Sequence, residues 1–166
     1  MYVTDHAFQV SGWQQVGTWI VSSLTPVSVS PASGTGAYQS FSVSYFDSAG
    51  YNDISEAHFL VQTSVNGVNA CYLKYNVQAN AFYLTDDAAS YWQGPVIPGT
   101  AGSVQNSRCV LTGNTSSVSY SGPNLTATFG LSFTSAFSGA KNTYAYVNTV
   151  SGPVAGWVQL GTWTVP

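Results

Sequence analysis

Apolar and polar side chains alternate with a period of two residues along most of this chain, and this pattern restricts the fold more than any other feature. In Asn124–Phe133 apolar residues occupy every second position, and in Ser40–Phe46 aromatic residues and valine alternate with serine. Successive side chains of a β-strand point to opposite faces, so each stretch predicts a strand with one buried face. Further strands are predicted at Val27–Ser30, Ala57–Thr63, Ala70–Val77, Phe82–Thr85, Ser107–Leu111, Ser116–Tyr120, Thr143–Asn148 and Val158–Val165.

Turn-forming residues separate the predicted strands. Glycine, asparagine, serine and proline are concentrated between them, and Asn66-Gly67 is the strongest hairpin signal among these turns. No stretch carries a sustained apolar stripe at helical spacing. Many short strands separated in this way predict an all-β, two-sheet antiparallel β-sandwich.

Charged residues are scarce, at 5% of the 166 residues compared with roughly 25% in an ordinary domain. With a net charge of −3 and three basic residues, the chain has no stripe that could follow a phosphate backbone, so nucleic acid is not an expected partner. No apolar run approaches the roughly 20 residues that cross a bilayer, so we expect no membrane insertion. The N-terminus also lacks the basic and apolar segments of a signal peptide.

Two cysteines, Cys71 and Cys109, lie on different predicted strands. A low charge content with many hydroxyl side chains is typical of exported proteins, in which disulfides persist. We therefore predict one disulfide between them. The alternative is a pair of buried free thiols.

Residues 1–21 and 145–165 are two copies of one segment, aligned without a gap and with ten identical residues. Repetition at a fixed offset is typical of repeat arrays. The sequence therefore predicts three parts: residues 1–22 as the C-terminal strands of a preceding repeat, 23–38 as a linker and first strand, and 27–166 as a complete β-sandwich repeat module.

The motif Gly-Trp-x-Gln-x-Gly-Thr-Trp occurs once in each copy. Its Trp, Gln, Gly and Trp stand at every second position, so we expect them on one face of a strand. The first copy has no module of its own, and unpaired apolar strands favour further pairing. We predict self-association by strand exchange or sheet-edge addition, with an interface that includes Trp13, Trp19, Trp157 and Trp163. The alternative is that the first copy packs on its own module as an extra hairpin.

Three stretches of the sequence carry a resemblance to a known kind of module. They are FDSAGYNDISEAHFLVQTSVNGVNACYLKYNVQANAFYLTDDA, GSVQNSRCVLTG and LTATFGLSFTSAFSGAKNTYAYVNTVSGPVAGWVQLGTWTVP. They resemble the tandem immunoglobulin-like or fibronectin type III-like repeat modules of large exported bacterial surface proteins of the acidobacterial type. The resemblance implies an immunoglobulin-like sandwich, a disulfide clasp, an extracellular or cell-surface location in a bacterium, and neighbouring repeats as partners. It brings no catalytic residue.

A loop rich in carboxylates follows the strand Ser40–Phe46. Asp47, Asp53 and Glu56 lie within ten residues, interleaved with glycine and asparagine. Calcium takes six to eight oxygen ligands, so these carboxylates could supply part of a calcium site. The alternative is a turn whose Asp and Asn side chains cap backbone amides. No other cofactor is predicted.

Aromatic side chains favour a binding role. Tyr83, Tyr91 and Trp92 border the Pro- and Gly-containing stretch 88–102, where an exposed ring could stack on a sugar or a partner surface. The alternative is that Trp92 folds over an open end of the sandwich. Tyr72 and Tyr75 should lie on opposite faces of their strand, so one of them points away from any single core.

Catalytic signals are weak. Asp86 and Asp87 are adjacent, so on a strand they would point in opposite directions. His58 is expected to be exposed or at a sheet edge, and no nucleophile elbow, zinc motif or phosphate loop occurs. We therefore predict a non-catalytic extracellular structural or adhesive repeat module. A carbohydrate-binding module with an aromatic loop platform is the first alternative, and a small hydrolase is the second.

Overall fold

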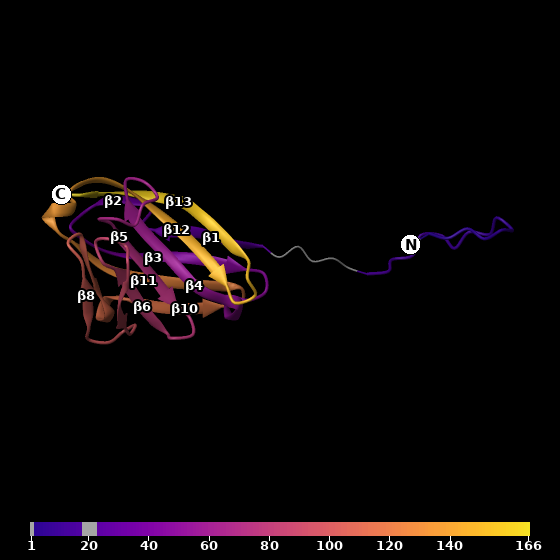
Figure 1. The fold of residues 1–166 in the computed structure, drawn as a ribbon, viewed down its shortest axis with the longest axis horizontal. Helices are drawn as coiled ribbons and strands as arrows, with labels where there is room; N and C mark the ends of the chain where they lie inside the picture. Colours follow the sequence, from indigo (N-terminus) through magenta and orange to yellow (C-terminus); the bar gives the residue numbers. More distant parts are fainter. Residues whose placement is uncertain (1, 18–22) are drawn as a thin grey trace.

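The computed structural model describes residues 2–17 and 23–166, and from Leu24 onward it is a β-sandwich of two sheets (Figure 1). The six-stranded sheet has the order β1 (Leu24–Ser30), β3 (Tyr38–Asp47), β11 (Asn124–Phe133), β9 (Cys109–Thr112) and β8 (Ser103–Gln105), and β10 (Ser117–Ser121) also pairs with β11. The seven-stranded sheet has the order β2 (Ser33–Thr35), β13 (Val154–Val165), β12 (Gly139–Thr149), β4 (Ile54–Gln62), β5 (Cys71–Asn76), β6 (Ala81–Thr85) and β7 (Trp92–Val96). Three single-turn 3₁₀ helices, Tyr51–Asp53, Gly113–Thr115 and Ser135–Phe137, interrupt the strands.

The predicted all-β two-sheet sandwich is confirmed, and each predicted strand corresponds to an observed one. Three short strands were not predicted: β2, β7 and β8. In β7 two residues interrupt the alternation of apolar and polar side chains. Gly94 has a φ of 136°, and Pro95 has no backbone N–H to donate a hydrogen bond to a neighbouring strand. All strand pairs are antiparallel except β2 with β13, which are parallel.

The core lies between the two sheets and consists of the inward residues of the alternating strands. Phe59 of β4 is fully buried, and its ring centroid lies 5.4 Å from that of Phe41 and 5.4 Å from that of Phe129, both in the opposite sheet. Tyr45 is also fully buried, and its hydroxyl donates a hydrogen bond of 2.8 Å to the carbonyl oxygen of His58. Burial raises the pKa of the Tyr45 phenol well above its usual value, so this hydroxyl remains a donor.

The predicted disulfide is confirmed. Cys71 and Cys109 are bonded, with a Cα–Cα distance of 5.7 Å, and both are fully buried. Because Cys71 lies in β5 and Cys109 in β9, the bond joins the two sheets to each other.

The prediction that Trp157 and Trp163 share one face of their strand is wrong. Trp163 is 5% exposed and belongs to the core between the sheets, whereas Trp157 packs on the outside of the seven-stranded sheet. The β12–β13 register shifts between these two tryptophans: Thr143 is opposite Gly161, but Tyr144 is opposite Gln159. One extra residue on β13 turns the following side chains to the other face, as a β-bulge does.

The remaining segments lie outside or at the margin of the sandwich. Residues 23–38, predicted as a linker and first strand, contain β1 and β2, both of them paired. Residues 2–17 extend away from the sheets, with one β-bridge between Thr4 and Val10 (Figure 1). Trp19 lies outside the described residues. In the described ranges, no helix is long and apolar enough to cross a membrane.

Candidate ligand-binding face

Aromatic side chains cover the outside of the seven-stranded sheet. They arise at alternate positions of neighbouring strands, opposite the residues that fill the core: in β5, for example, Tyr75 is fully buried in the core while Tyr72 points outward. All members of the group are half-buried, so each ring keeps part of its surface open to solvent. We call this group the aromatic face, and it consists of Tyr72, Tyr83, Trp92, Tyr146 and Trp157.

The rings of the aromatic face are arranged around His58, the residue at its centre. The His58 ring centroid lies 5.2 Å from that of Tyr146, 5.8 Å from that of Trp92 and 6.4 Å from that of Trp157. The ring centroid of Tyr72 lies 4.9 Å from that of Trp92 and 5.5 Å from that of Trp157. The rings are tilted or edge-on to one another, which is a favourable arrangement for aromatic quadrupoles.

Three polar side chains cross the same face from β4 to β5. The Oε2 atom of Glu56 lies 3.2 Å from Nε2 of His58, and its Oε1 atom accepts a hydrogen bond of 2.6 Å from Nζ of Lys74. The ammonium group of Lys74 also lies 4.6 Å from the ring centroid of Trp92 and 5.6 Å from that of Tyr83, within cation–π range. Glu56, His58 and Lys74 therefore form one connected group beneath and between the rings.

The protonation of this group follows from its contacts. The hydrogen bond from His58, together with Lys74, holds the pKa of Glu56 far below its usual value, so Glu56 is a carboxylate at neutral pH. Burial, reinforced by the charge of Glu56, raises the pKa of Tyr72 to about 12. The Tyr72 hydroxyl therefore stays protonated, 3.0 Å from Nδ1 of His58.

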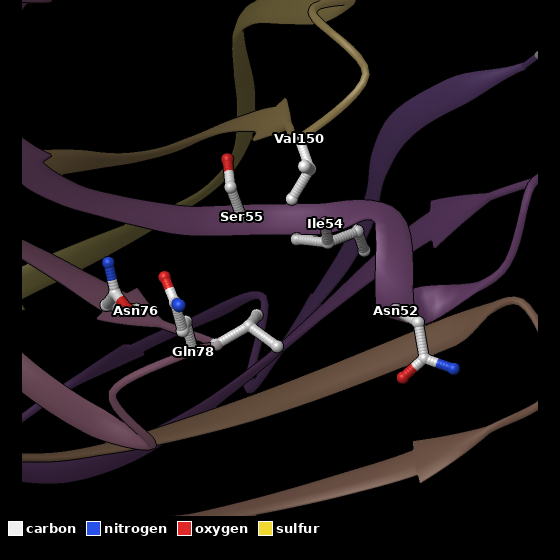
Figure 2. A pocket seen from close by; sticks show the side chains of 7 residues that line it. Asn52, Ile54, Ser55, Asn76, Gln78 and Val150 are labelled. Carbon is white, nitrogen blue, oxygen red and sulfur yellow. The ribbon is translucent and has the colours of Figure 1, made fainter.

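A pocket of about 370 Å³ lies where β4 begins and β5 ends, and both apolar and amide side chains line it. Ser55, Asn76 and Gln78 direct their polar ends to the same side of the ribbon, whereas Asn52 points away from them (Figure 2). Asn76 links this pocket to the aromatic face, because its Nδ2 atom lies 3.4 Å from Oε1 of Glu56. Stacking surfaces and amide hydrogen-bonding groups are thus adjacent on one side of the sheet.

No family model, curated protein or solved structure matches this chain. The immunoglobulin-like character and the resemblance to bacterial surface repeats therefore stay predictions.

Two of the three predicted sugar-binding residues lie on the aromatic face, and the third lies on a loop. Trp92 and Tyr83 lie on the aromatic face, and Tyr91 is 59% exposed on the loop just before β7. Reasoning from the sequence did not assign Tyr146 or Trp157 to a sugar-binding site. Tyr146 lies in the predicted strand Thr143–Asn148, and Trp157 was predicted only as an interface residue. The expectation for His58 is wrong: it is 6% exposed, because aromatic side chains from β5, β7, β12 and β13 cover it.

The three predicted calcium ligands do not come together. Asp47 and Asp53 line one small pocket, but Glu56 is bound to His58 and Lys74 on the aromatic face. Asp53 accepts hydrogen bonds from the backbone and side chain of Ser151. No group of three or more His, Cys, Asp or Glu side chains that could hold a metal occurs in the described part of the chain. Calcium binding therefore stays a prediction, and of the three carboxylates Asp47 and Asp53 line a common pocket.

The two adjacent aspartates bind loop groups. Asp86 accepts hydrogen bonds from the backbone of Ser90 and Tyr91, and Asp87 accepts two from Ser107. These contacts stabilise the loops around β7 and β9.

The low pKa of Glu56 predicts a specific acid sensitivity. An unfolded chain binds a proton at Glu56 near pH 4.3, whereas the folded chain resists protonation there. The ionised Glu56 carboxylate therefore stabilises the folded chain fully above about pH 5, and this contribution is lost as the pH falls below that value. We expect the free energy of unfolding to fall less steeply between about pH 5 and about pH 2 in the Glu56→Gln variant than in the wild type, measured by urea denaturation. Parallel curves would contradict this assignment.

Proposed function

We propose that this chain is a non-catalytic, extracellular adhesive module that binds carbohydrate through the aromatic face. The observation that carries the proposal is the gathering of the half-exposed rings of Trp92 and Trp157 around His58, on a face that Asn76 connects to the neighbouring pocket. Aromatic rings offer the apolar C–H faces of sugars a large, rigid contact area. Amide and hydroxyl groups nearby can hydrogen-bond sugar hydroxyls and fix the orientation of the ligand.

Charge favours an uncharged glycan. Lys74 carries the positive charge of the face, and Glu56 already binds it at 2.6 Å. The whole chain carries a net charge of −3, so a sulfated or uronic acid-rich polysaccharide would meet no compensating positive field. The expected ligand is a neutral polysaccharide.

The extracellular part of the proposal is supported by the disulfide. Cys71–Cys109 is buried between the sheets, and such bonds form and persist in oxidising compartments. Together with the scarcity of charged residues, it fits a module that works outside the cell.

Binding should depend on the two indoles of the face. We expect the wild-type chain to be retarded in native gels that contain a neutral polysaccharide, from a panel of β-glucan, mannan, xylan and galactan. Trp92→Ala and Trp157→Ala should each weaken binding by about 30-fold, which corresponds to about 2 kcal/mol for a buried aromatic contact. The control is Tyr38→Ala, which removes a 56% exposed ring from β3 of the other sheet. Equal losses in all three variants, or no retardation by any member of the panel, would contradict the proposal.

A further inference from the structure

Residues 2–13 form a small hairpin, here called the N-terminal hairpin, that repeats the end of the β12–β13 hairpin. Its β-bridge joins Thr4 to Val10, and the residues at the same places in the second copy, Asn148 and Val154, are also paired. The backbone hydrogen bond next to this pair is repeated as well, at 3.0 Å in the N-terminal hairpin and 3.1 Å in β12–β13. The two copies therefore share a turn, not only a sequence.

The aromatic pair of the hairpin is repeated with the same geometry. The ring centroids of Tyr2 and Trp13 are 5.4 Å apart with an interplanar angle of 37°, and those of Tyr146 and Trp157 are 5.5 Å apart with an angle of 36°. The second pair belongs to the aromatic face. The N-terminal hairpin is thus already shaped like two neighbouring strands of the seven-stranded sheet.

The surroundings of the two copies differ. Val147 is fully buried in the sandwich, but its counterpart Val3 is 54% exposed. Trp13 is 83% exposed and Phe8 is 87% exposed, whereas Trp157 is half-buried against its neighbours. An isolated hairpin with apolar side chains exposed to solvent is marginally stable, and it gains stability when it adds to a sheet.

The seven-stranded sheet offers an edge that such a hairpin can extend. On the side of β13 away from β12, β2 pairs only with Thr162–Thr164. No strand in the described part of the chain pairs with residues 154–160 on that side. Along this stretch Val154 is 60% exposed and Val158 is 39% exposed.

We infer that the N-terminal hairpin of one chain adds to the open half of β13 in a second copy and extends its seven-stranded sheet. The occupant is a second copy because the hairpin reproduces strands that already belong to this sheet, with the same turn and ring pair. The added hairpin brings Tyr2 and Trp13 to the sheet that carries the aromatic face. Association of this kind is heterologous, so it can continue from copy to copy. It requires no carbohydrate and stands apart from the proposed function.

The test is sedimentation equilibrium of the full chain over a range of protein concentrations without polysaccharide. We expect the wild type to form dimers and larger species as the concentration rises. Trp13→Ser removes the hairpin's indole outside the sandwich, and Gly156→Lys places a charge on the edge strand where a new Cβ meets no atom within 4 Å. Each variant should sediment at the single-chain mass. The control Val65→Lys, at a 51% exposed position in a loop, should associate like the wild type.

Several outcomes would overturn the inference. They are a wild type that stays at the single-chain mass at every concentration, association that survives Trp13→Ser, and equal loss of association in the Val65→Lys control. Trp13→Ser leaves the sandwich untouched, so its result does not depend on the folding of the Gly156→Lys variant.

Discussion

Replacing Phe59 by alanine is expected to lower the free energy of unfolding by about 3–5 kcal/mol. The ring is fully buried and contacts Phe41 and Phe129 of the opposite sheet, so its removal leaves a cavity between the two layers. Neither neighbour can move far into that space, because both lie in the middle of paired strands. Urea denaturation followed by intrinsic fluorescence measures the change.

The matched control is Phe8→Ala, which removes the same side chain from the N-terminal hairpin. Phe8 is 87% exposed, so this substitution should leave the free energy of unfolding within about 0.5 kcal/mol of the wild type. A small effect of Phe59→Ala, or equal effects of the two substitutions, would show that Phe59 is not at the centre of the core.

The second large effect is expected from removal of the disulfide. Cys71 and Cys109 are separated by 38 positions, and closing a loop of this length restricts the unfolded chain by about 4 kcal/mol at room temperature. The double variant Cys71→Ala/Cys109→Ala should lose about this amount in urea denaturation. Since the bond joins β5 to β9, its loss leaves the two sheets connected at this place by side-chain packing and by the hydrogen bonds that Asn106 donates to the carbonyl oxygens of Ala70 and Thr85.

Reductant provides the control for this prediction. The wild type in excess reductant should unfold at about the same urea concentration as the double variant, whose own midpoint should not respond to reductant. A double variant as stable as the oxidised wild type would contradict the prediction.

Most of the fold could be predicted because the alternation is local. Asn124–Phe133 is one example, for which the predicted and observed bounds agree. The unpredicted strands β2 and β8 have three residues each, too few to show a period. The bulge in β13 could not be predicted either, because it depends on the register against β12 and not on the residues of β13.

The candidate site was only partly predictable for a related reason. The sequence places Tyr72 and Tyr75 on opposite faces of one strand, and it places Trp92 at the border of the Pro- and Gly-containing stretch 88–102. What brings them together with Tyr146 and Trp157 is the order β13-β12-β4-β5-β6-β7, which no local pattern contains. The same order explains the burial of His58: β4 lies in the middle of the sheet, so neighbours on both sides cover its outward side chains.

The hydrogen bond from Tyr45 to the carbonyl oxygen of His58 connects the core of the sandwich to the outside of the seven-stranded sheet. Tyr45 belongs to β3, yet it holds the backbone of the residue at the centre of the aromatic face. Any shift of one layer over the other would therefore move the middle of the aromatic face along with it. The affinity of the aromatic face for a ligand would then change with the packing of the core between the two sheets.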